Sequence, residues 1–427
     1  MKRRTALRFR FWLWVIVLAL GGCQSAPQAP DFSLVNLNYL DRLCRPVNLP
    51  DGEPAYYMHY STNRQGELAG PGPYGIGRID DAGRALLAYL RWHELTGDTA
   101  HARQMRGLVT VLLYMQAEDG RWYRWFTADG RRAGEGEIEN PGIGNGAAKA
   151  VWALGRYVKV GQAKSWPLVR EAGQAVERTL LALRPFLEQY PNMETIGDVD
   201  VPRWLPNGSN ADVASELLLG LVAYQHAGRR SELLQAAIDR LTAGIAMMQQ
   251  RREDAFAYGA HLSYRTIWHA WSNAQVQALV AVHQLTQRPE PLLTARREAE
   301  QFYPWLLEEQ FADRFDWLEA RNNRKAIDWF PQRPEHVRPV VLGCLALFEA
   351  TGEKRFAEMA GRAARWLLGD NAAHEAVYDP ETGGARAWIQ ARNSVRLEIS
   401  AGATAEALLM LMEVGRHSEA LKQVRHN

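Results

Sequence analysis

The chain has 427 residues, of which 47% are hydrophobic and 23% charged, and this balance predicts a globular protein with a large core. Its 50 lysines and arginines against 48 aspartates and glutamates give a formal net charge of +2. So small a charge excludes the strongly basic surface that nucleic-acid binding requires, and we expect no nucleic-acid partner.

The first 22 residues predict a secretion signal. Five basic side chains precede an apolar run from residue 11 to residue 20, which is too short to span a bilayer stably. Leu20-Gly21-Gly22-Cys23 follows and resembles a bacterial lipobox, so we expect Cys23 to carry lipid and to begin the mature chain. By resemblance to sorted lipoproteins, Gln24 in place of an aspartate indicates the outer membrane, facing the periplasm. The alternative is an ordinary signal peptide with an incidental cysteine.

Removal of residues 1–22 takes away five basic groups and no acidic one, which leaves 45 basic groups against 48 acidic, a net charge of −3. With Cys23 lipidated, only Cys44 and Cys344 remain. An oxidising compartment permits a disulfide, but Cys344 lies in an apolar helical run, so we predict two unpaired thiols. No spacing of cysteine and histidine is typical of a zinc site, and we expect neither a metal nor a cofactor.

After a tether and lead-in segment at residues 23–75, the chain is periodic. At intervals of about 64 residues, a polar or glycine-containing stretch opens into an apolar run of helical period. The six runs begin near Asp81, Asn145, Asn210, Asn273, Arg338 and Gly402. This period exceeds the roughly 34–47 residues of a two-helix solenoid unit and suits a long helical hairpin with a sizeable loop. We therefore predict an all-α fold, an (α/α)6 toroid spanning residues 76–427, with short strands in the outer-to-inner loops.

Several segments resemble a known superfamily. The segments are Ile79 to Leu86, Val151 to Gly155, Trp366 to Asn371 and Val377 to Gly384. They are similar to stretches in helical modules of bacterial exopolysaccharide clusters, within the six-hairpin glycosidase-like (α/α)6 superfamily. The resemblance implies glycoside hydrolase-like activity on a poly- or oligosaccharide, with polysaccharide export proteins as further partners. The chain has Thr404 where those modules place a glutamate, so that role does not carry over.

In such rings the substrate groove lies where the inner helices begin, and carboxylates there suit glycoside hydrolysis. The reaction needs one protonated carboxyl group and a second carboxylate about 5 to 9.5 Å away. We predict Asp80 and Asp81 on one side of the groove, and Glu139 or Asp212 on the other. The structural alternatives are helix-capping or dipole-favoured acids and, for Glu139, a solvated loop charge.

Polar and aromatic residues near the same helix openings are predicted to bind the saccharide. They are Tyr74, Arg78, Trp125, Asn145, Trp204, Asn210, His269, Trp271, His336, Arg338 and Glu398. Two other functions remain open. A uronate-type lyase or epimerase would use His269 or Tyr264 as the base, and Arg338, Asn145 and Asn210 to neutralise a carboxylate. A non-catalytic saccharide-binding scaffold of an export system would keep the aromatic residues alone.

Overall fold

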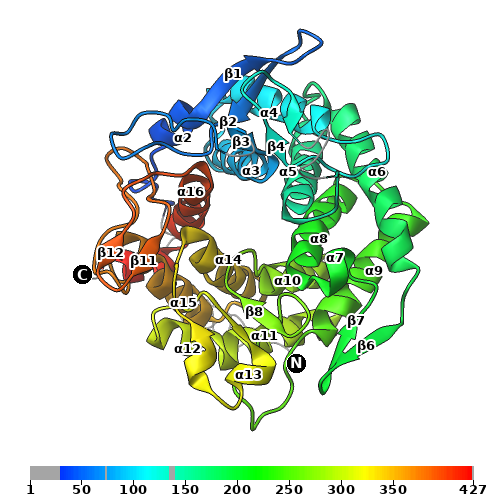
Figure 1. The fold of residues 1–427 in the computed structure, drawn as a ribbon, viewed down its shortest axis with the longest axis vertical. Helices are drawn as coiled ribbons and strands as arrows, with labels where there is room; N and C mark the ends of the chain where they lie inside the picture. Colours follow the sequence, from blue (N-terminus) through cyan, green and yellow to red (C-terminus); the bar gives the residue numbers. More distant parts are fainter. Residues whose placement is uncertain (1–28, 73–74, 134–139, 426–427) are drawn as a thin grey trace, which may run out of the picture.

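Six inner helices form a closed ring in the computed structural model, which describes residues 29–72, 75–133 and 140–425 (Figure 1). They are α3 (Ile79–Thr96), α5 (Asn145–Gln162), α8 (Ala211–His226), α10 (Gln275–Thr286), α14 (Pro334–Thr351) and α16 (Ala401–Arg416). Each packs against the next, and α16 packs against α3. The predicted (α/α)6 toroid is therefore confirmed, and the predicted openings fall within four residues of the observed helix starts.

The outer layer completes the six hairpins. Its helices are α4 (Ala102–Tyr114), α6 (Val169–Leu187), α9 (Glu232–Met247), α11 (Pro289–Gln301) with α12 (Tyr303–Glu308), α15 (Lys354–Ala364) and α17 (Ser418–Arg425). Gly97 and Gly352 end α3 and α14 in the left-handed conformation, with φ of 75° and 72°, as expected for glycine after a helix.

The core lies between the two layers and within the ring. In α8, every residue from Ala211 to Tyr224 is buried, because neighbouring inner helices, an outer helix and the ring axis surround it. The backbones of α5 and α8 approach so closely that a Cβ on Gly155 would lie 2.2 Å from the carbonyl oxygen of Gly220. Cys44 and Cys344 are both buried and unpaired, as predicted.

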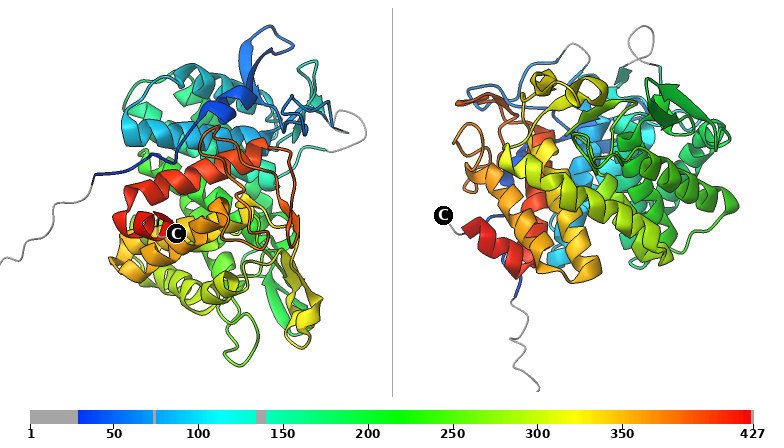
Figure 2. Two further views of the ribbon diagram at one scale, coloured as in Figure 1. Left: turned by 90° about the vertical axis from the view of Figure 1, so that its left-hand side faces the viewer. Right: turned by 90° about the horizontal axis from the view of Figure 1, so that it is seen from below.

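Short antiparallel strands occupy the lead-in and the outer-to-inner loops. The sheets are β1 (Cys44–Asn48) with β2 (Pro54–Met58); β3 (Gly77–Arg78) with β4 (Trp125–Phe126) and β5 (Arg132–Ala133); β6 (Met193–Ile196) with β7 (Val199–Pro202); β8 (Ile267–His269) with β9 (Arg314–Asp316) and β10 (Ile327–Asp328); and β11 (Ile389–Ala391) with β12 (Ser394–Val395). Short helices α2 (Asn38–Leu43), α7 (Pro206–Ser209) and α13 (Trp317–Ala320) complete the connections. These loops gather at the end of the ring where the inner helices begin, which we call the mouth (Figure 2).

The lead-in segment runs along the outside of the ring from one end to the other. The amide of Asp31 donates to the carbonyl of Gly415 near the C-terminal end of α16, whereas the amide of Ala401, at the start of the same helix, donates to the carbonyl of Tyr60. Cys23 lies outside the described residues. Within the described part of the chain, no helix combines the length and apolarity needed to cross a membrane.

Candidate functional site

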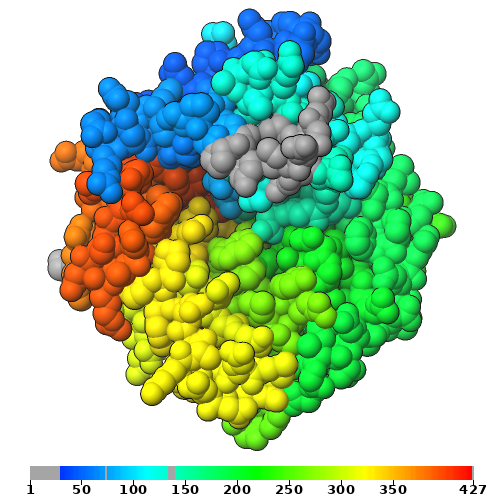
Figure 3. All heavy atoms as spheres, viewed as in Figure 1, coloured from blue at the N-terminus to red at the C-terminus, as the bar shows by residue number. Residues whose placement is uncertain are grey.

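The mouth carries a recess near the ring centre, between the blue, orange and yellow segments of the surface (Figure 3). The inner helices begin at this end of the molecule. Their first turns present backbone amides that lack intrahelical partners and carry several of the side chains predicted to act on a saccharide, among them Asp80, Asp81, Asn145 and His336.

Asp80 and Asp81 open α3 beneath this recess and are bound by two arginines. Arg78, the last residue of β3, donates from Nε and Nη2 to the two carboxylate oxygens of Asp81 at 2.9 and 3.1 Å. Arg84, one turn further along α3, donates from Nη1 to Asp80 Oδ2 at 2.9 Å. Burial opposes ionisation of Asp80, but Arg78, Arg84 and Arg124 outweigh it and hold the pKa of this carboxyl group below its usual range. Asp80 is therefore an ionised group.

Glu335 brings a further carboxylate to the same place and was not among the predicted site residues. It lies in the first turn of α14 and is partly exposed, and its Oε2 atom is buried without a hydrogen-bond partner among the described residues. A Cβ on Gly402 would lie 2.8 Å from Asp81 Oδ1 and 3.0 Å from Glu335 Oε1. These two oxygens are therefore at most 5.8 Å apart, the sum of those distances. The absence of a side chain at Gly402 lets the two carboxylates approach across α16.

A network of buried charges closes the ring axis below the recess. Lys149 Nζ lies 2.7 Å from Glu216 Oε1 and 3.1 Å from Glu406 Oε1. Arg338 contacts the same two glutamates at 3.2 and 2.9 Å, and Arg84 Nε donates to Glu406 at 2.9 Å. Burial opposes ionisation of Glu406, but the three cations lower its pKa to about 2.

Arg338 was predicted to bind substrate, and this prediction is wrong. Its side chain is 0% exposed, and its guanidinium group forms ion pairs with Glu216 and Glu406. Its guanidinium carbon lies 5.3 Å from the centre of the Trp152 ring, on which Lys149 Nζ also packs at 4.9 Å. Arg338 therefore neutralises buried carboxylates in the network.

Asp212 is also buried, next to His269. The carboxylate is fully buried; Gln275 Nε2 donates to its Oδ1 at 2.6 Å, and His269 Nδ1 lies 3.1 Å from its Oδ2. Burial raises the pKa of Asp212 well above its usual range. Asp212 is therefore buried beside His269, and its predicted role as a catalytic carboxylate in direct contact with the saccharide is corrected.

His269 and His336 are neutral imidazoles on neighbouring hairpins. Burial lowers the pKa of His269 to about 4, and its ring stacks on Trp271 with centroids 4.0 Å apart. The carbonyl of Trp271 lies 3.1 Å from His269 Nδ1 and can only accept a hydrogen bond, so we assign the proton to Nδ1 and leave Nε2 as the basic atom. His336 is 1% exposed, and neither of its ring nitrogens has a hydrogen-bond partner among the described residues.

Asp313 approaches His336 from the loop between α12 and β9. Its Oδ1 atom lies 3.7 Å from His336 Nε2. Burial raises the pKa of Asp313 to about 6. This aspartate, which the sequence did not single out, therefore keeps a proton at a pH where an ordinary carboxyl group has lost it.

The remaining predicted residues lie at the mouth, outside the described part of the chain, or in structural positions. Asn145 and Trp125 lie at the mouth: Asn145 Oδ1 is buried without a partner among the described residues, and Trp125 lies beside Arg78, whose guanidinium carbon is 5.6 Å from the ring centre. Glu398 is also at the mouth and pairs with Arg64 at 3.4 Å. Tyr74 and Glu139 lie outside the described residues.

Asn210 and Trp204 have structural positions. Asn210 caps α8, with its Oδ1 accepting from the amide of Val213 at 2.9 Å. Trp204 is 0% exposed and donates from Nε1 to the carbonyl of Arg240 at 2.8 Å, against the outer helix α9. The predicted saccharide platform at Trp204 is therefore wrong, because its indole packs into the outer core.

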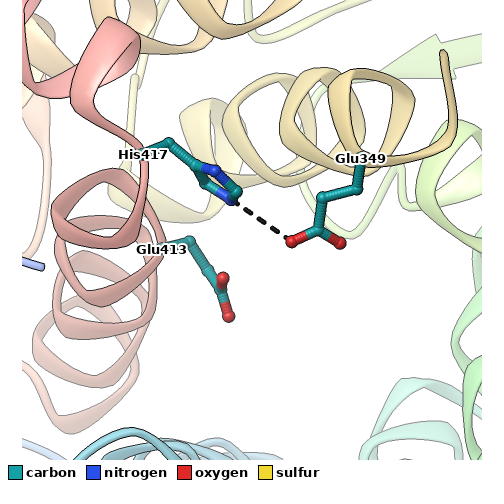
Figure 4. A group of neighbouring side chains, drawn as sticks. All are labelled: Glu349, Glu413 and His417. Carbon is teal, nitrogen blue, oxygen red and sulfur yellow. Dashed lines mark ion pairs between the residues drawn. The ribbon is translucent and has the colours of Figure 1, made fainter. Parts of the chain in front are cut away.

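A group with metal-ligating side chains lies at the other end of the ring. Glu349, Glu413 and His417 bring one ligand atom each to within 4.8 Å of one another at the C-terminal ends of α14 and α16 (Figure 4). Arg416 Nη1 lies 3.0 Å from Glu349 and 2.7 Å from Glu413. Since this arginine already supplies positive charge to both carboxylates, their proximity does not require a metal ion.

Comparison with solved structures identifies the fold, whereas comparison with sequences finds no relative. No protein-family model matches the sequence, and no curated protein matches it. Among solved structures, cellobiose 2-epimerase from Bacillus thermoamylovorans has a TM-score of 0.64 at 13% identity, over 89% of this chain and 96% of that one. D-mannose isomerase has a TM-score of 0.57 at 12% identity, over 91% and 99% of the two chains. An unsaturated glucuronyl hydrolase specific for heparin has a TM-score of 0.53 at 11% identity, over 90% and 95%. These neighbours are six-hairpin (α/α)6 toroids, as the sequence resemblance implied.

Proposed function

We propose that the protein is a saccharide-processing enzyme of the glycoside hydrolase type, which cleaves a bacterial exopolysaccharide or an oligosaccharide derived from it. The observation that carries the proposal is the meeting of Asp81 and Glu335 across Gly402, at most 5.8 Å apart. This limit is compatible with the roughly 5–5.5 Å between the carboxyl groups of retaining glycosidases. Glu335 is the partly exposed member of the pair, so it is the one placed to touch a bound sugar.

The charges around the pair suit the two roles that hydrolysis requires. One carboxyl group must donate a proton to the glycosidic oxygen, and another must be ionised to act as base or nucleophile. Asp81, whose pKa burial raises above its usual range, fits the first role. Glu335, which lies beside Arg84 across Gly402, is assigned the second.

The recess also offers polar atoms that a sugar can satisfy. Asp80 Oδ1, Asn145 Oδ1, Glu335 Oε2 and both ring nitrogens of His336 are buried without a hydrogen-bond partner among the described residues. Buried polar atoms are normally paired with protein or water. The hydroxyl groups of a saccharide would pair with these atoms from three different inner helices. The lipid anchor at Cys23 and a periplasmic location at the outer membrane belong to the same proposal.

An epimerase or isomerase is the second candidate. It is favoured by the two neutral histidines, because proton abstraction next to a carbonyl carbon needs an unprotonated base, and by the folds of cellobiose 2-epimerase and D-mannose isomerase. In this case His336 or Nε2 of His269 removes the proton.

Product analysis distinguishes the two functions. The purified full-length protein is incubated with host exopolysaccharide and with its oligosaccharides, and the products are separated by chromatography. New reducing ends at constant sugar composition support hydrolysis. An epimerised or isomerised sugar at constant chain length supports the second candidate, and activity should then disappear in His336→Ala or in His269→Ala, whichever is the base. Binding without any change in the sugar would contradict both and leave a saccharide-binding scaffold.

A further inference from the structure

Two arginines at the mouth pack on one tryptophan. Gln332 and Ile389 exchange both of their backbone hydrogen bonds, and this bridge brings Arg333, the residue before α14, next to Trp388, the residue before β11. The guanidinium carbon of Arg333 lies 5.4 Å from the centre of the Trp388 ring, and that of Arg396 lies 5.5 Å from it. The indole therefore holds two guanidinium groups in place beside the start of α14.

Arg333 has no acidic partner in the described part of the chain. Its Nε atom is buried without a hydrogen-bond partner among the described residues, none of whose carboxylates lies within 4.0 Å of its guanidinium group. Arg333 does act on Asp313 electrostatically, but the contact of Asp313 is with His336, at 3.7 Å. The Arg333 side chain is only partly exposed. Since buried polar atoms are normally paired, this guanidinium group is available to a ligand.

Arg396 adds a second positive group whose pairing is incomplete. Its Nη1 atom lies 3.9 Å from Glu398 Oε1, an oxygen that Arg64 contacts at 3.4 Å. The Nε atom of Arg396, like that of Arg333, is buried without a partner among the described residues. Arg64 and Arg396 thus share one carboxylate while Arg333 has none, which leaves this part of the mouth with an excess of positive charge.

Arg333 lies beside the carboxylate pair proposed to cleave the glycosidic bond. It precedes Glu335 by two residues, and Glu335 faces Asp81 across Gly402. The helix that starts here, α14, has 18 residues, and the N-terminal end of a helix attracts anions. His336, in the same first turn, is 1% exposed and has two unpartnered ring nitrogens among the described residues. An anionic group held by Arg333 therefore belongs to a molecule that also reaches Glu335.

We propose that the mouth takes an acidic saccharide and that Arg333 binds the carboxylate of a uronic acid unit next to the bond that is cleaved. The inference rests on the proposed function of the mouth and names its class of substrate. A guanidinium group binds a carboxylate through two parallel hydrogen bonds, and stacking on Trp388 fixes the plane of this one. Arg338 cannot serve in its place, because it is paired with Glu216 and Glu406.

Calorimetric titration with one set of oligosaccharides, before and after removal of its charge, tests this proposal. The probes are oligosaccharides of the host exopolysaccharide and the same oligosaccharides after carbodiimide-mediated reduction, which converts each carboxylate to a neutral hydroxymethyl group. We expect the full-length protein to bind the acidic form about tenfold more tightly or better, as a charge-assisted hydrogen bond contributes.

Four variants locate the effect. Arg333→Gln should lose that tenfold for the acidic form and bind the reduced form as the unmodified protein does. Arg333→Lys, which keeps the charge without the planar fork, should lose less. Arg396→Gln should weaken the acidic form alone. Arg170→Gln, the control, removes an arginine whose side chain is 81% exposed on the outer helix α6 and should change neither affinity.

The same samples separate this proposal from that of hydrolysis, since chromatography of the recovered oligosaccharide reports new reducing ends. Cleavage of both forms at equal rates and equal affinity would uphold hydrolysis and overturn the acidic specificity. Preferential binding of the acidic form without cleavage would uphold the specificity and contradict hydrolysis. An equal loss of both affinities in Arg333→Gln, or a host exopolysaccharide without carboxyl groups, would also overturn the inference.

Discussion

Replacement of Lys149 by methionine should destabilise the protein strongly, because this ammonium group sits between two buried glutamates. Its side chain is 1% exposed, and it lies 2.7 Å from Glu216 and 3.1 Å from Glu406. Removal of one partner of a buried ion pair costs about 3–5 kcal/mol, since the other charge stays buried. Arg338 still contacts both glutamates and Arg84 still contacts Glu406, so we expect the lower end, about 3 kcal/mol.

Urea unfolding of the Lys149→Met, Glu216→Gln and double variants measures this energy. The double variant should be more stable than Lys149→Met alone, because the second substitution removes a buried carboxylate that has lost its nearer cation. Lys325→Met, at an exposed position, is the matched control and should change the stability by less than about 0.5 kcal/mol. A loss below about 1 kcal/mol in Lys149→Met, or no recovery in the double variant, would refute the view that the network holds compensating charges.

Three further predictions concern the mouth and the anchor. Gly402→Ala should reduce activity more than it reduces stability, because the added carbon would lie 2.8 Å from Asp81 and 3.0 Å from Glu335; equal activity would contradict the close approach of these carboxylates. Burial raises the pKa of Asp313 from 3.8 to about 6, so the folded state binds the proton more tightly and stability should fall as pH rises from about 4 to 6. Asp313→Asn should remove this part of the pH dependence of the unfolding temperature. An unchanged pH profile in this variant would show that Asp313 does not cause the dependence. Cys23→Ser should move the protein from the membrane to the soluble fraction after cell fractionation, whereas retention in the membrane would show that another segment anchors it.

The fold could be predicted because its signal is repeated six times. Each inner helix contains an apolar run that begins near polar or glycine residues, so the period can be recognised despite errors of a few residues at any one opening. The largest error was at the fifth helix, which begins at Pro334 and not near Arg338. That shift of one turn carries Arg338 from the predicted mouth into the charge network below it.

The candidate site could be predicted only where neighbours in sequence are also neighbours in space. Asp80 and Asp81 are bound by Arg78 and Arg84 of the same segment, and this pairing is visible in the sequence. Glu335 was missed because its proximity to Asp81 depends on the closure of the ring over Gly402, which a linear pattern does not show.

Loop residues were the least predictable. The position of Trp204 in an outer-to-inner loop suggested the mouth, but its indole turns outward and donates to the backbone of α9. Asp212 lies in a first helical turn as expected, yet its side chain points toward Gln275 and His269 of the next hairpin. The side to which such residues turn is decided by packing between hairpins, and sequence period alone does not specify it.

The rate of glycosidic bond cleavage by Glu335→Gln tests the central claim most directly. Glutamine keeps the size of the side chain but removes its charge, and loss of a general base or nucleophile costs about 10²–10⁴ in rate. We predict such a loss in new reducing ends from host exopolysaccharide, with an unfolding midpoint close to that of the unmodified protein. The control Glu194→Gln removes an exposed carboxylate that pairs with Arg265 and should retain full activity. Cleavage by Glu335→Gln at the unmodified rate would contradict the proposed site.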